Sequence, residues 1–226
     1  MSVFDTLAKY DRHTNKVYVP LGIVNYSTPV NSTEFAIHAA RYAVRFFKAL
    51  VPVLYPNYAR TLGQRRDSWL YSKQYQGRFE AAVDCLLTQY HNTNEDLKST
   101  FLRTLADRTS AGPALMEQTL ALMQAYSAFK ELLNNQSTQR SNFQLAGQLQ
   151  GGTPEQLFFV AYAQDNCDTS DNVHRRRQFH ADISQLPPED RVNFPLTQLE
   201  AFARAFACNH TESMVANKRC PIIRAP

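Results

Sequence analysis

The pattern of apolar and polar positions along this 226-residue chain predicts a mostly helical protein. Apolar side chains recur every three or four residues in several long stretches, which is the spacing of one helix face. The predicted helices cover residues 32–52, 67–90, about 94–107, 113–134, 154–167 and 195–206. Ser32 or Thr33 would cap the first of them, and Pro52 would end it. Pro113 is expected at the first position of its helix, where its missing N–H does no harm.

A short alternating run after Lys16 predicts one strand near the N-terminus, which Pro20 and Gly22 interrupt. We find no internal repeat, so we expect one mainly α domain over residues 1–226. Residues 135–153 are rich in Gln, Ser and Gly, which is typical of a loop. The expected parts are a strand and turn segment (1–26), a helical core (32–134), this polar loop (135–153) and a C-terminal helical segment (154–226).

Composition narrows the possible partners. The apolar fraction of 44% and the charged fraction of 19% are ordinary for a globular protein. A net charge of +4, without a recognition motif, argues against a nucleic-acid partner. No apolar run approaches the roughly 20 residues of a transmembrane helix. Residues 1–13 also lack the basic and then apolar pattern of a signal peptide.

Two features point instead to a secretory route. Asn-x-Ser/Thr triplets, which are glycosylation acceptors in secreted proteins, occur at Asn25, Asn31, Asn135 and Asn209. The four cysteines are Cys85, Cys167, Cys208 and Cys220. No pair has the C-x-x-C spacing of a zinc or redox site, so disulfides and buried thiols both remain open.

The helix predicted over residues 32–52 carries an unusual line of bases. His38, Arg41, Arg45 and Lys48 are three or four residues apart, which places them on one helix face. A search for chemistry by residue type finds no active site. No two of the six histidines are four residues apart, and no G-x-S-x-G motif or phosphate-binding glycine loop is present.

Four segments nevertheless resemble, in the same order, the neprilysin family of zinc metallopeptidases. They are "NKVYVPLGIV", "DSWLYSKQYQGRFEAAVDC", "PEQLFFVAYAQDNC" and "DRVNFPLTQLEAFARAFAC". The resemblance covers that family's C-terminal catalytic domain and has no counterpart of its large N-terminal helical portion. It implies a gluzincin, neprilysin-like fold that is mainly α, with a small residual β element near the N-terminus.

The resemblance places the family's zinc helix on residues 32–52. In the family, an H-E-x-x-H motif supplies two zinc ligands and a glutamate that activates water. Here Val44 and Lys48 stand at the histidine positions, and Arg45 stands at the position of the glutamate.

The other site positions have changed as well. The family's third ligand belongs to an E-x-x-x-D motif, which "RTLAD" resembles, so that Arg103 replaces the ligand while Asp107 is retained. The histidine that stabilises the tetrahedral intermediate falls near Gln185. By the resemblance, three residues that hold the substrate in the family are unchanged in this chain: Ala8, Tyr10 and Arg191.

These substitutions oppose a zinc ion. Arginine cannot deprotonate, so it neither coordinates a metal nor acts as a base. Unit charges about 4 Å apart interact by roughly 4 kcal/mol near a protein surface, and a dication doubles the repulsion. We therefore expect no cofactor. A salt-bridge cluster of Arg45, Lys48, Arg103 and Asp107 would compensate the buried charges; the alternative is a solvated basic face.

The resemblance also implies a pairing of cysteines. Cys85 and Cys220 match two cysteines that are bonded to each other in the family's catalytic domain. Closing so long a loop stabilises by roughly 4–5 kcal/mol in the chain-entropy description. Cys167 and Cys208 match cysteines whose partners lie in the family's N-terminal portion, so here they would be free, paired together or bonded to another chain.

The sequence thus favours a catalytically inactive neprilysin-like homologue with a binding or modulatory role. Its expected partners are peptides or another neprilysin-like chain. The alternative is an active zinc metalloendopeptidase, and a third reading is a fragment without an independent role. The family resemblance, the triplets and the cysteines point to an extracellular or membrane-associated location, although residues 1–13 carry no export signal.

Overall fold

The computed structural model describes residues 8–11, 13–20, 32–55, 72–93, 105–135, 152–167 and 186–222, with the side chains of 32–34, 93, 105–110 and 135 left aside. In these segments the chain is mainly helical, as the apolar spacing predicts. None of the described helices is long and apolar enough to cross a membrane. The part of the predicted helix at 94–104, most of the polar loop at 135–153, and the triplets at Asn25 and Asn31 lie outside the described residues.

A small antiparallel hairpin forms the N-terminal part of the structure. It pairs β1 (Lys9–Asp11) with β2 (Lys16–Tyr18). The Asp11 carboxylate accepts hydrogen bonds from the His13 N–H at 2.9 Å and the Thr14 hydroxyl at 2.8 Å, which holds the turn. Asn15 has φ of 52°, a left-handed conformation that asparagine tolerates.

The predicted helix with the line of bases is present but is not uniform. It consists of α2 (Ser32–His38), the π-helical turn η1 (Ala39–Ala43), α3 (Val44–Leu50) and the 3₁₀ turn η2 (Val51–Leu54). Pro52 lies in the first turn of η2, so the helical path continues two residues past the predicted end. Because a π turn inserts an extra residue, it offsets α2 from the regular spacing of α3.

The long central helix differs from the prediction at its start. After α5 (Lys73–Thr93), a single helix, α7 (Leu105–Asn135), runs through Pro113. The prediction of a separate helix starting at Pro113 was therefore wrong. Ala111 and Gly112, just before the proline, are buried, and a Cβ on Gly112 would lie 2.5 Å from Val83 of α5. This close packing offsets the backbone hydrogen bond that Pro113 cannot donate.

Of the two predicted C-terminal helices, the first begins at the predicted residue and the second does not. In α8 (Pro154–Asp165), Thr153 and Gln156 form a reciprocal capping box. The predicted helix at 195–206 is instead the end of α10 (Pro188–Gln198) followed by α11 (Glu200–Ala205). Leu199 between them is extended and buried, because its side chain belongs to the core.

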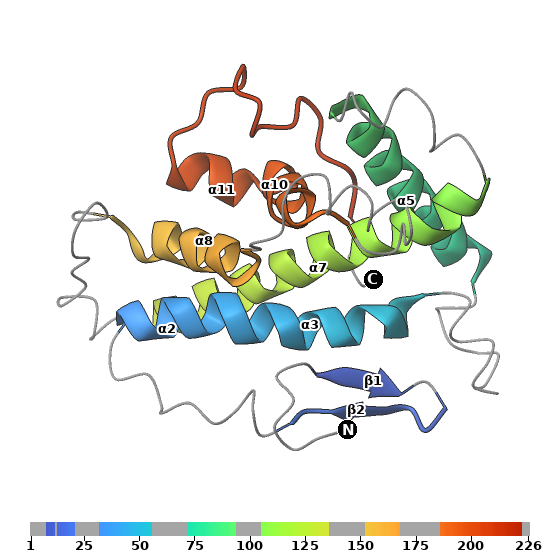
Figure 1. Ribbon diagram of the computed structural model, residues 1–226, viewed down its shortest axis with the longest axis horizontal. Helices are drawn as coiled ribbons and strands as arrows, with labels where there is room; N and C mark the ends of the chain where they lie inside the picture. Colours follow the sequence, from blue (N-terminus) through green and yellow to red (C-terminus); the bar gives the residue numbers. More distant parts are fainter. Residues whose placement is uncertain are drawn as a thin grey trace.

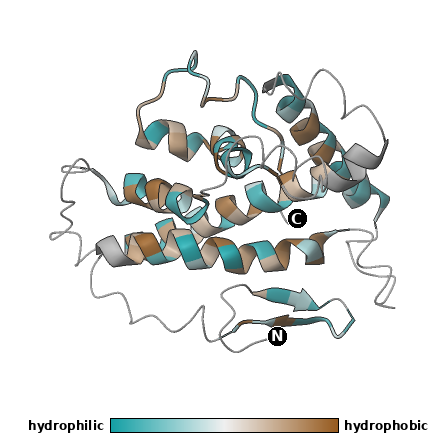
Figure 2. Cartoon of the chain, in the orientation of Figure 1, coloured by the Kyte–Doolittle hydropathy of each residue, from teal (hydrophilic) through white to brown (hydrophobic). Residues whose placement is uncertain are grey.

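These helices pack around α7 (Figure 1). Helix α7 contacts α3, α5 and α10. Helices α2 and α11 both lie against α8, and the hairpin lies beside α3. Figure 2 shows hydrophobic positions interspersed with hydrophilic ones along α3 and α7. Stacked and edge-on aromatic rings join α7, α8 and α11. Their centroids are 5.0–5.5 Å apart in the pairs Tyr126–Phe158, Tyr126–Phe159, Phe129–Phe158, Phe158–Phe159 and Phe159–Phe202.

Candidate functional site

A cavity of about 310 Å³ lies between the hairpin and α3, on the helix face that carries Arg45 and Lys48. Three of its lining side chains are cationic and one is a carboxylate. The lining residues are Ala8, Lys9, Tyr10, Arg45, Lys48, Ala49, Pro52 and Glu117. The structure therefore brings together Arg45 and Lys48 with Ala8 and Tyr10, the residues that the resemblance assigned to the catalytic and substrate-binding positions.

The other two bases of the helix do not line this cavity. His38 packs edge-on against the Tyr42 ring, with centroids 5.5 Å apart. The Nε of Arg41 is buried, and no hydrogen-bond partner for it is found in the segments that the structure describes. His38 ends α2 and Arg41 lies within the π turn, so both precede the regular helix of Arg45 and Lys48. The line of four bases seen in the sequence is thus divided in the structure.

Arg45 is held by a carboxylate from another helix. Its Nε and Nη2 donate to the two carboxylate oxygens of Asp165, at 3.0 and 2.5 Å. The two side chains are 25% and 17% exposed. A bidentate, charge-assisted pair of this kind fixes both position and orientation. Asp165 ends α8, so the ion pair ties that helix to α3.

Lys48 and Glu117 interact electrostatically, without the direct hydrogen bonds that join Arg45 to Asp165. Burial lowers the pKa of the Lys48 ammonium, the nearby Glu117 opposes this shift, and Arg191 adds to it. Burial likewise raises the pKa of the Glu117 carboxyl, against the effect of Lys48. The structure records no hydrogen bond or ion pair for Lys48 within the described segments. The two groups therefore interact through space, and burial disfavours the charge on each.

Arg191 lies on α10, with its positive charge close enough to Lys48 to influence it. Its backbone carbonyl accepts a 2.6 Å hydrogen bond from the buried Tyr162 hydroxyl. Its Nε is buried and has no hydrogen-bond partner among the described residues. On the opposite side, Tyr10 in β1 donates to Asn15 at 2.9 Å, which steadies the hairpin at the edge of the cavity.

The described residues do not suit a zinc ion. Zinc takes imidazole, thiolate or carboxylate ligands, and a catalytic site uses three of them. Val44 is 5% exposed within the core, and Arg45 and Lys48 present cations. In the described part of the chain, no three histidine, cysteine, aspartate or glutamate residues are grouped to hold a metal. Arg103, Gln185 and the side chain of Asp107 lie outside the residues described.

The predicted salt-bridge cluster of Arg45 and Lys48 also contains Arg103 and Asp107, whose side chains lie outside the described residues, so it stays a prediction. Arg45 binds Asp165, and the carboxylate that acts on Lys48 most strongly is Glu117. Sequence reasoning missed both acids. The available signals were an aspartate within the "AYAQDNC" segment and a single glutamate inside the apolar stretch around residues 114–123.

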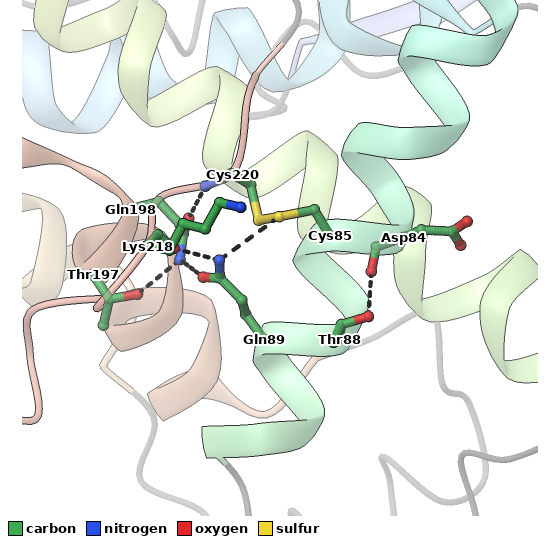
Figure 3. Close-up of a disulfide and its surroundings, with 8 residues drawn as sticks. All are labelled: Asp84, Cys85, Thr88, Gln89, Thr197, Gln198, Lys218 and Cys220. Carbon is green, nitrogen blue, oxygen red and sulfur yellow. Dashed lines mark hydrogen bonds between the residues drawn. A yellow bond between two sulfur atoms is a disulfide. The ribbon is translucent and has the colours of Figure 1, made fainter.

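Away from the cavity, Cys85 of α5 is joined by a disulfide to Cys220, as the resemblance implied. Figure 3 shows the surrounding amide network. The Gln198 side chain donates to Gln89 at 2.7 Å and accepts from the Cys220 N–H at 3.0 Å, and Gln89 also donates to the Lys218 carbonyl. The C-terminal segment is thereby fixed to α5 and α10.

The remaining cysteines and two glycosylation candidates lie near helix ends. Cys167 is exposed after α8, and Cys208 is partly exposed after α11; both are free thiols. Asn209 is exposed in the turn that follows α11. Asn135 is the last residue of α7.

Comparison with known proteins gives concordant matches. Residues 57–222 match the sequence profile described as "Peptidase family M13". The chain is 29% identical over 161 residues to "Neprilysin-1" of Caenorhabditis elegans, a match that covers 71% of this chain and 20% of that protein. The fold resembles the Mycobacterium tuberculosis zinc metalloprotease Zmp1, solved in complex with an inhibitor, with a TM-score of 0.69 and 20% identity. That match covers 98% of this chain and 33% of the other, so the chain spans a fifth to a third of these relatives.

Proposed function

Since this chain belongs to peptidase family M13, we propose that it is a catalytically inactive member that captures peptides without cleaving them. The observation that carries the proposal is the ion pair of Arg45 with Asp165. By the resemblance, Arg45 stands where the family has its water-activating glutamate. A guanidinium held there cannot accept a proton from water, and its charge opposes a zinc ion nearby.

The cavity supports a remaining role in binding. Tyr10 of the strand β1 and Ala8 just before it line the cavity, and Arg191 is retained on α10. A strand edge and a cavity of about 310 Å³ can accept an extended peptide segment. The partner would be a peptide or a segment of another neprilysin-like chain.

Zinc content and peptide cleavage, measured on the same purified sample, test the proposal. After dialysis against zinc, elemental analysis should find much less than one equivalent, and a quenched fluorescent peptide should stay uncleaved. The variant V44H/R45E/K48H/R103E, which restores the family's ligand types at these positions, is the positive control for zinc uptake. One equivalent of zinc in the unmodified chain, with chelator-sensitive cleavage, would instead identify an active zinc metalloendopeptidase.

We further propose that the protein works in an oxidising, extracellular or membrane-associated setting. The Cys85–Cys220 disulfide supports this, because such bonds persist mainly outside the cytosol. Asn209, which is exposed, is a candidate for a glycan. Mass mapping of alkylated peptides from protein made in a secretory host should find Cys85 and Cys220 protected and Asn209 glycosylated. Labelling of Cys85 and Cys220 without reduction would refute the assignment.

A further inference from the structure

The charges around the cavity are unevenly satisfied. Among the described residues, Lys9, Arg45 and Lys48 line it against one carboxylate, that of Glu117. Asp165 neutralises Arg45 through two hydrogen bonds. Positive charge is therefore in excess at the wall formed by Lys9 and Lys48.

Lys48 is the least satisfied of these groups. It is partly buried, and an ammonium has three N–H donors that need acceptors when water is removed. Within the described segments the structure records no acceptor for them. Glu117 acts on Lys48 through space without an ion pair, and burial holds the Glu117 carboxyl toward its neutral form by raising its pKa. The positive charge of Arg191 also acts on Lys48, and in the described part of the chain the buried Arg191 Nε has no hydrogen-bond partner.

We propose that this cavity binds a carboxylate group of the captured peptide, with the Lys48 ammonium as its main hydrogen-bond donor. The inference rests on the proposed peptide capture and names the chemistry that the captured peptide must carry. A carboxylate accepts several hydrogen bonds and matches the net positive wall. Its source is either an acidic side chain or the free C-terminus of the peptide.

Binding of four fluorescein-labelled pentapeptides, measured by fluorescence anisotropy, tests the proposal. The peptides share one sequence and carry either glutamate or glutamine at the centre and either a free or an amidated C-terminus. At least one of the carboxylate-bearing peptides should bind about tenfold or more tightly than the uncharged glutamine amide, since hydrogen bonds to charged groups are worth that much. The peptide that shows the gain identifies the source of the carboxylate.

The preference should disappear in K48M and return in K48R, while K73M, which removes an exposed lysine outside the cavity, should leave it unchanged. A thermal melt of each variant establishes that it is folded. Equal binding of all four peptides, unaffected by K48M, would overturn the carboxylate site and leave peptide capture standing. Absence of binding by all four peptides would overturn both.

Discussion

Arg45 of α3 and Asp165 of α8 are 120 positions apart in the chain and are joined by two hydrogen bonds. Arg45 lines the cavity between the hairpin and α3. The pair holds α8 against the helix that, by the resemblance, once carried the metal ligands. The Arg45–Asp165 contact therefore stabilises the packing of α8 on α3 and also fixes a guanidinium group at the cavity.

The substitution D165N should lower the free energy of unfolding by about 1–3 kcal/mol, because it leaves the partly buried Arg45 guanidinium without its counter-charge. Urea denaturation followed by circular dichroism measures this loss. The matched control is E200Q, which weakens the exposed Glu200–Arg204 pair and should change stability by no more than about 0.5 kcal/mol. The double variant R45M/D165N should recover part of the loss; additive destabilisation would contradict the coupling of the two residues.

A second prediction concerns the dependence of stability on pH. Burial raises the pKa of Glu117 above its ordinary value, so between that value and the shifted pKa the folded state binds more protons than the unfolded state. The contribution of Glu117 to stability therefore increases as the pH falls through this window. Lys48 is the charged group that acts on Glu117, and Arg45, Asp165 and Arg191 act in turn on Lys48.

Unfolding measured from pH 7 to pH 4.5 checks this sign. The unfolding free energy of the unmodified chain should rise relative to that of E117Q as the pH falls. The control is E131Q, which removes an exposed glutamate from the same helix. A difference between wild type and E117Q that stays constant, or that shrinks as the pH falls, would contradict the assignment.

Much of the helical fold follows from local sequence signals. The apolar spacing identified the helices around 73–93 and 154–165, and Thr153 with Gln156 capped the latter as such pairs do. The errors arose at prolines. Pro113 and Pro195 were read as helix starts, yet both lie inside helices, because packing against neighbouring elements outweighs their local preference.

The candidate site was only partly accessible from the sequence. The line of bases and the family resemblance identified Arg45 and Lys48, but not their carboxylates. Asp165 and Glu117 come from α8 and α7, and their approach to α3 depends on how helices distant in sequence pack. The π turn before Val44 was also missed, since no spacing of residue types specifies it.

Loss of the disulfide should destabilise the protein far more than loss of its free thiols. The bond joins positions 135 residues apart, so removing it with C85A/C220A should lower the unfolding free energy by about 2–5 kcal/mol. The variant C167S/C208S changes only thiols outside the bond and should unfold close to wild type. Guanidinium titrations of the three proteins make the comparison. Equal destabilisation by both double variants would show that the effect comes from cysteine packing and not from the cross-link.

Two helical glycines should respond in opposite directions to the same substitution. A Cβ on Gly112 of α7 would lie 2.5 Å from Val83 Cγ1 and 3.2 Å from Leu87 Cδ1, whereas a Cβ on Gly77 of α5 would meet nothing within 4 Å. Alanine gains about 1 kcal/mol over glycine from helix propensity alone. G77A should therefore raise the unfolding free energy by about 0.5–1 kcal/mol. G112A should lower it, because overpacking of a core contact costs about 1–3 kcal/mol and Val83, being β-branched, has little freedom to move. Urea midpoints compared at constant m-value measure both changes, and a stabilising G112A would mean that α5 and α7 are less tightly packed than their side chains indicate.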